Sequence, residues 1–232
     1  MIPLRDINPT ERFAIVTSTL IVLNIVVFVY EIALGRIAGE IFVQTFALVP
    51  AKLFASSQTA GQAVPVFVTL FTSMFLHGGP LHIAGNMLYL WVFGNNIEDS
   101  MGRIRFVVFY VLCGLFAAFA HAFANRYSSV PMIGASGAIS GVLGAYLLLF
   151  PRARVVTLVF FGFFIRTVQI PAMAVLGFWF ALQFLNALLD SGSGGGVAWY
   201  AHVAGFIAGM LLIGLFKRKT VSFWGGRRSQ YL

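Results

Sequence analysis

The chain has 232 residues, of which 59% are hydrophobic and only 9% are charged, and its mean hydropathy is +0.91. Soluble domains carry about 25% charged residues, so this composition excludes an ordinary soluble protein and indicates an integral membrane protein. The net charge of +8 is dispersed among apolar runs, which argues against a nucleic-acid-binding surface. The single cysteine, Cys113, excludes an internal disulfide and a cysteine-based metal site.

Six apolar segments approach the roughly 20 residues that an α-helix needs to cross a bilayer. They cover residues 13–33, 81–97, 106–124, 136–150, 172–189 and 198–216. These segments predict an all-α membrane protein, a bundle of six transmembrane helices that forms one domain over residues 1–232. The fourth segment is short, and we expect it to begin inside the membrane among the other helices, because unpaired helix-end amides are not tolerated facing lipid.

The distribution of positive charge predicts the orientation of the bundle. If the N-terminus is cytosolic, only Arg36, Lys52 and Arg126 of the 15 Lys and Arg residues fall on the outer side. The positive-inside rule therefore predicts that both termini are cytosolic, with residues 1–12 as an N-terminal segment and residues 217–232 as a basic tail.

Two apolar stretches lie outside the six segments. Residues 155–165 are too few to cross as a helix, and a seventh crossing would move the basic tail to the wrong side. We expect this run on the inner face, as an interfacial segment or a short hairpin. The long outer loop, residues 35–79, is amphipathic around Pro50 and is expected to dip into the outer membrane interface.

The first apolar segment exceeds the usual signal-peptide core, and no clean small-residue cleavage site follows it, so we predict that it is retained. No transit-type extension rich in Arg and Ser precedes it. These features favour the plasma membrane of a prokaryote, with an organellar form trimmed of its presequence as the alternative.

Polar residues are costly inside membrane spans, so the few that occur there are candidates for function. Ser136 lies in the string Gly134-Ala-Ser-Gly137, at the start of the fourth segment. Flanking glycines allow a close turn, and free amides at a helix start can stabilise an oxyanion. A serine among small residues can equally serve close helix packing alone, so this string by itself leaves both interpretations open.

A histidine on the sixth segment strengthens the catalytic interpretation. Two pairs of glycines have the small-x-x-x-small spacing, Gly137 with Gly141 on the fourth segment and Gly205 with Gly209 on the sixth. His202 shares the glycine face of the sixth segment, so packing of the two faces would bring it to Ser136 as a general base. No intramembrane carboxylate is available to orient the imidazole, which predicts a dyad rather than a triad. A purely structural histidine is the alternative.

The second segment supplies further polar groups. His82 and Asn86 are one helical turn apart and therefore share a face, and His77 lies at the preceding loop boundary. Their donors could stabilise developing negative charge, or they could simply join helices through hydrogen bonds. Acyl transfer by a serine and a histidine needs no metal and no organic cofactor.

These motifs together resemble the rhomboid family of intramembrane serine proteases. The resemblance rests on His77-Gly-Gly-Pro-Leu-His82-Ile-Ala-Gly-Asn86, Gly134-Ala-Ser136-Gly137 and Ala201-His202-Val-Ala-Gly205. It implies that Ser136 is the nucleophile and His202 the general base, and that the oxyanion site comprises His82, Asn86 and the Ser136 amide. It also implies that His77 is a polar helper near a water-filled cavity, and that Ala201 and Gly205 support tight packing of the fourth and sixth helices.

The sequence departs from the family pattern at two places. The first loop lacks the Trp-Arg pair of some members, and Ser140 stands where some members have a tyrosine that stacks on the histidine. The resemblance nevertheless implies an endopeptidase that cleaves single-span membrane proteins where Gly, Ser or Pro lets the helix unwind. The alternatives are a non-catalytic client-binding relative, which would lack Ser136 or His202, and a small transporter, which would show paired repeats and intramembrane acids.

Overall fold

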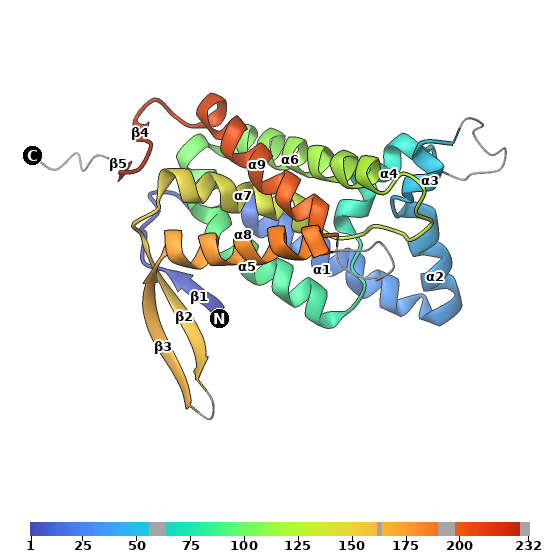
Figure 1. The fold of residues 1–232 in the computed structure, drawn as a ribbon, viewed down its shortest axis with the longest axis horizontal. Helices are drawn as coiled ribbons and strands as arrows, with labels where there is room; N and C mark the ends of the chain where they lie inside the picture. Colours follow the sequence, from blue (N-terminus) through green and yellow to red (C-terminus); the bar gives the residue numbers. More distant parts are fainter. Residues whose placement is uncertain (56–63, 162–163, 190–197, 228–232) are drawn as a thin grey trace, which may run out of the picture.

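The computed structural model describes residues 1–55, 64–161, 164–189 and 198–227. Long helices run side by side along the longest axis, and a small sheet lies at one end of them (Figure 1). The helices are α1 (Ile15–Ala33), α2 (Gly35–Phe46), α3 (Pro50–Leu53), α4 (Val66–Thr72), the 3-10 helix η1 (Ser73–Phe75), α5 (Pro80–Met101), α6 (Arg103–Ala124), α7 (Ser136–Leu149), α8 (Ala172–Leu189) and α9 (Trp199–Phe216). The strands are β1 (Ile2–Asp6), β2 (Arg154–Phe161), β3 (Phe164–Pro171), β4 (Val221–Ser222) and β5 (Gly226–Arg227).

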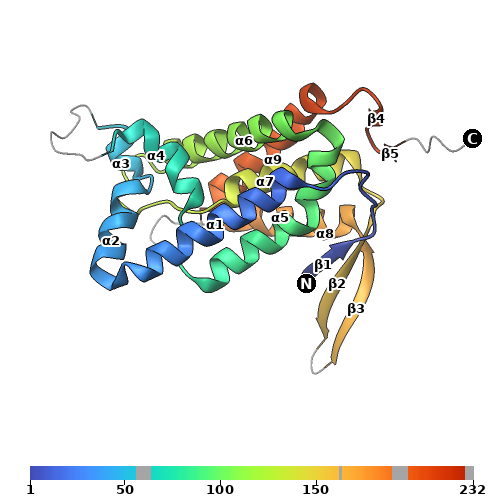
Figure 2. The same ribbon diagram turned by 180° about the vertical axis from the view of Figure 1, so that it is seen from behind.

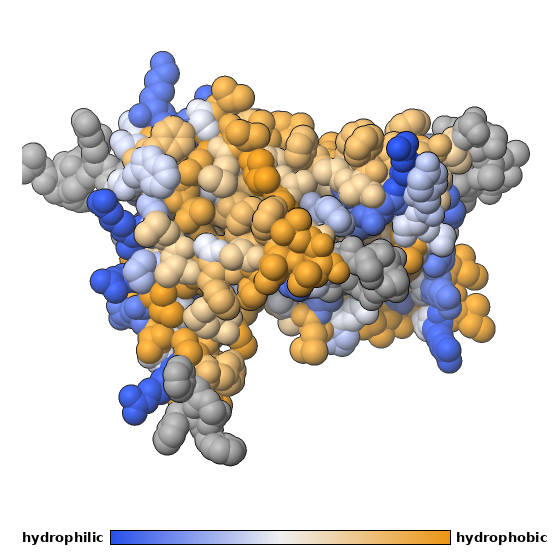
Figure 3. Space-filling view, in the orientation of Figure 1, coloured by the Kyte–Doolittle hydropathy of each residue, from blue (hydrophilic) through white to orange (hydrophobic). Residues whose placement is uncertain are grey.

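Each of the six predicted apolar segments is helical, as α1, α5, α6, α7, α8 and α9. Four of these, α1, α6, α8 and α9, are each long and apolar enough to cross a membrane. A fifth crossing results if α4 with η1 and α5, which are bent by 80°, are counted as one broken span. Apolar side chains cover much of the face of the bundle that is seen in Figure 3. The chain is therefore a mostly helical, multi-pass membrane protein.

The short helix α7 lies at the centre of the bundle, packed against α5, α6, α8 and α9. Every residue from Gly137 to Tyr146 is buried. Its small side chains allow this close packing on several sides: Gly137, Ala138, Ser140, Gly141, Gly144 and Ala145. Because α7 has only 14 residues, it is about 21 Å long at about 1.5 Å per residue, which is shorter than the hydrocarbon core.

Glycines bring the backbones of α7 and α9 into direct contact, as the sequence predicted. A Cβ atom on Gly205 would collide with the carbonyl oxygen of Gly137, and one on Gly209 would collide with the carbonyl oxygen of Gly141. Gly141 itself faces α6, where a Cβ atom would come within 2.5 Å of the Cβ of Cys113. The approach of α9 to α7 therefore has no room for a side chain at these positions.

The sheet corrects the prediction of an all-α chain. Strands β1, β2 and β3 pair antiparallel in that order, with Ile2 opposite Leu158 and Arg154 opposite Pro171. The apolar run at 155–165 is thus part of a hairpin, which was one of the two predicted alternatives. Its valines, threonine and aromatic residues favour extended backbone, and it is too short to cross as a helix.

The N-terminal strand and the segment after α9 lie at the same end of the bundle (Figure 2). The amide of Ile7 donates to the carbonyl of Arg154 at 2.7 Å, and that of Arg218 donates to the carbonyl of Ser100 at 2.9 Å. This arrangement agrees with the prediction that both ends of the chain lie on one side. Residues 228–232 of the predicted tail are outside the described residues.

The predicted outer loop is largely helical, comprising α2, α3, α4 and η1. It is tied to the segment that precedes α7, because Leu48 pairs with Met132 and the amide of Ala51 donates to the carbonyl of Ser128 at 3.0 Å. On α2, Ile37 is 77% and Ile41 62% exposed, which is the kind of apolar surface that an interfacial helix presents. Insertion of this loop into the outer interface stays a prediction.

A half-buried carboxylate, Asp6, anchors β1 to the helices. The hydroxyl of Tyr146 donates to Oδ2 of Asp6 at 2.7 Å, and Nδ2 of Asn96 donates to the same oxygen at 2.6 Å. Burial raises the pKa of the Asp6 carboxyl from 3.8 to about 6, although the hydrogen bond from Tyr146 opposes this shift. The folded state is therefore favoured when Asp6 is neutral, because burial penalises its charged form more than the hydrogen bond from Tyr146 stabilises it.

The contact between α7 and α9 generates a stability prediction. Gly205→Leu places a side chain against the carbonyl of Gly137 and should lower the free energy of unfolding by about 3 kcal/mol or more, at the upper end of overpacking effects. Ile207→Ala, on the same helix at a position 42% exposed, should lower it by less than about 1 kcal/mol because lipid or detergent fills the space. Unfolding of both variants in detergent measures this. Equal stability of Gly205→Leu and the unaltered protein would contradict the backbone contact.

The half-buried carboxyl of Asp6 predicts a pH dependence of stability. Since its pKa is higher in the folded protein than in the unfolded chain, the folded state binds the proton more tightly. Stability should therefore fall as the pH rises from about 4 to about 6, and remain lower above that range. Asp6→Asn keeps a neutral acceptor and should flatten this part of the profile, measured as the thermal unfolding midpoint in detergent between pH 4.5 and pH 7.5. Identical profiles for the two proteins would assign the titration to another group.

Candidate active site

A cavity of about 800 Å³ lies between α5, α7, α8, α9 and the segment that precedes α7. Its polar lining includes His82, Asn86, Ser136, Gln183 and His202. Ser136 is the first residue of α7, and the last residue of that helix precedes the sheet, so the cavity lies toward the end of the bundle that is opposite the sheet. By the predicted orientation this is the outer end.

The structure brings Ser136 and His202 into hydrogen-bonding contact. Nε2 of His202 is 2.8 Å from Oγ of Ser136, which is within the range of a nucleophile and its general base. The contact follows from the packing of α7 and α9, because the residue that approaches Gly137 is Gly205, one turn after His202.

A glutamine that the sequence interpretation missed completes the arrangement. Nδ1 of His202 is 2.7 Å from Oε1 of Gln183, a buried residue of α8. The amide oxygen can only accept, so Nδ1 carries the proton and Nε2 of the neutral ring is free to accept from the serine hydroxyl. The sequence predicted a dyad because no carboxylate lies within the spans, whereas a neutral amide can also accept from Nδ1. The sequence does contain a signal for Gln183, because an amide in the middle of an apolar span is costly and therefore indicates a functional role.

Two tryptophans flank the imidazole of His202. The ring of Trp179 lies 6.0 Å from it at an interplanar angle of 37°, and the ring of Trp199 lies 6.2 Å from it edge to face. Ser140, which stands where some relatives have a stacking tyrosine, donates its hydroxyl to the carbonyl of Ser136 at 2.6 Å. The histidine is thus confined by rings from α8 and α9 rather than by a residue of α7.

His82 and Asn86 both line the cavity, as expected of oxyanion donors. Nδ2 of Asn86 donates one hydrogen to Nε2 of His77 at 3.0 Å, which leaves its second amide hydrogen for another acceptor. His77 is fully buried and packs edge to face on His82 at 5.1 Å. It therefore lies behind Asn86, near the cavity, and holds the Asn86 amide in place.

Gly134 shapes the turn that leads into α7. Its φ of +124° is in the region that favours glycine, and a Cβ atom would come within 2.8 Å of Nε2 of His82. Its amide donates to the carbonyl of Ser73 at 2.8 Å, which fixes the turn to η1. The first amides of α7, including that of Ser136, then begin at the cavity without intrahelical partners.

The site offers hydrogen-bond donors and one base rather than a set of metal ligands. Among the residues described above, no group of three or more His, Cys, Asp and Glu side chains has the geometry to hold a metal ion. The chemistry that the geometry allows is nucleophilic attack by a serine, with an adjacent base and with donors for a developing oxyanion.

The fold and the cavity define a multi-pass helical membrane protein with a polar chamber inside the bundle. A model of the Rhomboid domain matches residues 65–219, more than half of the chain and the part that carries the whole cavity lining. The chain belongs to the rhomboid family.

Named relatives agree with this assignment. The mitochondrial Rhomboid protein 1 of Saccharomyces cerevisiae is 30% identical over 172 residues, covering 70% of this chain and 45% of that protein. The rhomboid protease GluP of Bacillus subtilis is 34% identical over 161 residues, covering 66% of this chain and 28% of that protein. RHOMBOID-like protein 1 of Arabidopsis thaliana is 31% identical over 143 residues, covering 62% and 33%. The matched part thus spans less than half the length of each of these relatives.

Proposed function

We propose that this protein is an intramembrane serine endopeptidase in which Ser136 is the nucleophile and His202 the general base. The observation that carries the proposal is the 2.8 Å contact between Nε2 of His202 and Oγ of Ser136. Membership of a family that includes a protein named as a protease, GluP of Bacillus subtilis, supports it.

In the proposed reaction, Oγ of Ser136 attacks the carbonyl carbon of the substrate peptide bond while Nε2 of His202 takes the hydroxyl proton. His82, Asn86 and the amide of Ser136 stabilise the negative charge that develops on the carbonyl oxygen. The imidazolium then gives its proton to the leaving amine, and a water molecule, activated by the same imidazole, hydrolyses the acyl-enzyme.

Gln183 is the positioning residue of this mechanism. Its amide oxygen accepts from Nδ1 of His202 at 2.7 Å and so selects the tautomer in which Nε2 is the base. In a membrane span this neutral acceptor avoids the large cost of burying a carboxylate, and it serves the orienting role that an aspartate has in soluble triads.

The proposed substrates are single-span membrane proteins within the lipid bilayer. All six long or central helices, α1, α5, α6, α7, α8 and α9, cross or enter the membrane in this proposal, and both chain ends are cytosolic. The concentration of Lys and Arg on one side supports that orientation. We place the protein in a prokaryotic plasma membrane. Cleavage is expected next to small residues in segments that unwind readily, because a helical backbone hides its carbonyls.

The dyad predicts a specific pattern of loss. Ser136→Ala and His202→Ala should each abolish labelling by a fluorophosphonate and cleavage of a model transmembrane substrate, and the double variant should be no slower than either single variant, because the two groups act as a unit. Ser100→Ala is the matched control, a buried serine of α5 whose hydroxyl bonds to its own helix. It should keep both activities.

Two outcomes would overturn the assignment. A double variant slower than either single variant by several orders of magnitude would show that Ser136 and His202 do not act as one catalytic unit. Binding of membrane clients with no fluorophosphonate labelling of the unaltered protein would point to a client-binding relative that does not cut.

The role of Gln183 predicts a change in rate rather than in binding. Gln183→Leu removes the acceptor for Nδ1 of His202 and should lower kcat by about 10- to 100-fold, as loss of the hydrogen-bond partner of a metal-ligating histidine does, with little change in KM. Gln183→Glu restores an acceptor oxygen and should recover part of kcat, with a shifted pH profile. Asn186→Leu makes the same kind of change one turn along α8 and should leave kcat unaltered. An unchanged kcat and pH profile in Gln183→Leu would show that the tryptophan rings alone hold the imidazole.

A further inference from the structure

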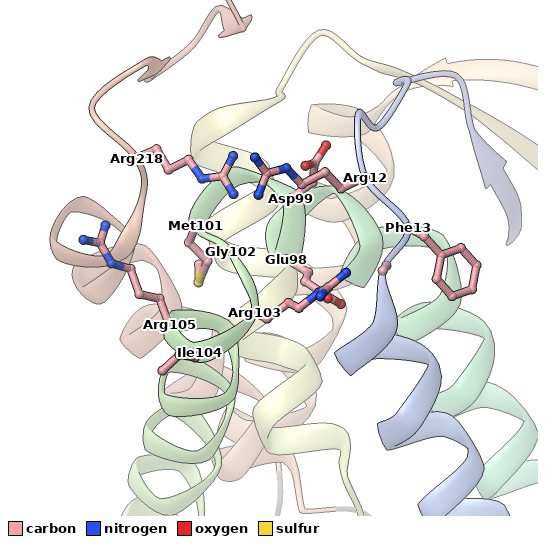
Figure 4. Close-up of a pocket in the computed structure, with 11 residues that line it drawn as sticks. Arg12, Phe13, Glu98, Asp99, Met101, Gly102, Arg103, Ile104, Arg105 and Arg218 are labelled. Atoms are coloured by element: carbon pink, nitrogen blue, oxygen red, sulfur yellow. The ribbon is translucent and has the colours of Figure 1, made fainter.

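A second cavity, of about 450 Å³, lies at the opposite end of the bundle from Ser136, and it is lined by four arginines (Figure 4). They come from three separate parts of the chain. Arg12 precedes α1, Arg103 and Arg105 belong to the first turn of α6, and Arg218 follows α9. The fold has thus gathered into one hollow positive charges that are far apart in the sequence.

Two buried carboxylates, Glu98 and Asp99, also line this cavity. Oε1 of Glu98 accepts from the amide of Val16 at 3.0 Å, and its Oε2 accepts from the amide and hydroxyl of Thr17, each at 2.8 Å. Glu98 therefore caps the start of α1 from another helix. Asp99 accepts from the amide of Glu11 at 2.7 Å. These two carboxylates offset two of the four arginines that line the cavity, so its lining keeps an excess of two positive charges.

The start of α6 adds to the excess of positive charge. Within the described part of the chain, neither α1 nor α6 has an acidic residue in its first turn or a side-chain cap at its N-cap residue. Glu98 accepts from the first amides of α1. The free amides of α6 and the positive end of its dipole face the same region as Arg103 and Arg105. Cations are disfavoured at a helix N-terminus, so an anion placed here would interact favourably with both the arginines and the first amides of α6.

Apolar residues on the rim indicate what kind of anion fits. Phe13 and Ile104 line the cavity and are 74% and 82% exposed. The exposed apolar surfaces of α1 and α6 continue from these two residues along the helices, with Ile15 43% and Val107 44% exposed. A ligand at this edge thus meets guanidinium groups at one end and lipid-facing apolar surface at the other.

We propose that this cavity binds the phosphate headgroup of an anionic phospholipid of the inner leaflet, with the acyl chains against Phe13, Ile104 and the outer surfaces of α1 and α6. Guanidinium groups bind phosphate oxygens in pairs of hydrogen bonds, and basic pockets between helices on the cytoplasmic side are suited to anionic headgroups. The bound lipid would join α1, the turn between α5 and α6, and the segment after α9. This site is independent of the proposed catalysis.

The test compares phosphatidylglycerol, phosphatidylcholine and inorganic phosphate, each added to the delipidated full chain in detergent. Native mass spectrometry gives the apparent Kd, and thermal unfolding gives the stabilisation. We expect phosphatidylglycerol to bind and to raise the unfolding midpoint by several degrees, and the other two to have little effect. Arg103→Gln with Arg105→Gln should raise the apparent Kd for phosphatidylglycerol by about 10- to 30-fold.

The matched control is Arg152→Gln with Arg154→Gln, which removes two exposed inner-face arginines outside the cavity and should leave the apparent Kd within about twofold of the original. Ile104→Gln changes only the exposed rim, so it keeps the fold. It should weaken the binding of phosphatidylglycerol without altering the response to inorganic phosphate. An equal loss of affinity for phosphatidylglycerol in the control pair would show that the lipid is attracted by the surface charge in general and not by this cavity. Equal stabilisation by inorganic phosphate, or no binding of phosphatidylglycerol to the unaltered protein, would overturn the proposal.

Discussion

The contact of backbone against backbone between α7 and α9 is the constraint on which the rest of the site depends. It exists because Gly205 and Gly209 have no side chains where α9 meets the carbonyls of Gly137 and Gly141. In lipid, helices gain no hydrophobic energy from association, so close van der Waals packing of this kind provides much of the attraction. One consequence is that Ser136 and His202, 66 residues apart, meet at 2.8 Å.

The ends of α7 are held by polar contacts of different kinds. At the cavity, the turn before the helix is fixed through Gly134, whose amide bonds to η1. At the other end, the hydroxyl of Tyr146 reaches Asp6 in β1. The first strand, although far from the cavity, therefore belongs to the support of the helix that carries the serine. Small residues let α7 sit deep in the bundle, and these two polar anchors fix its position along the bundle axis.

The sequence predicted the helices well because membrane spans are set by length and hydropathy, and these can be read locally. The approach of Gly205 to the backbone of α7 was also predictable, since glycines at four-residue spacing mark a helix face. The side-chain position of Gly137, by contrast, faces Ala117 of α6. The strands β2 and β3 were harder, because an apolar run of that length is ambiguous between an interfacial segment and a hairpin. Gln183 was missed because its role depends on where α8 packs relative to His202. The burial of His77 behind Asn86 similarly depends on the bend before α5, which no local pattern reveals.

The shortness of α7 has a consequence for any peptide that reaches Ser136. The neighbouring α6 has 22 residues and α7 has 14, so the serine lies about eight residues, or about 12 Å, below the level where a full-length helix would end. An extended strand covers about 3.3 Å per residue, so about four unwound residues suffice to join the membrane surface to the serine, where a helix would need about eight. A segment that can unwind about one helical turn at its outer end therefore reaches the serine, whatever its exact sequence.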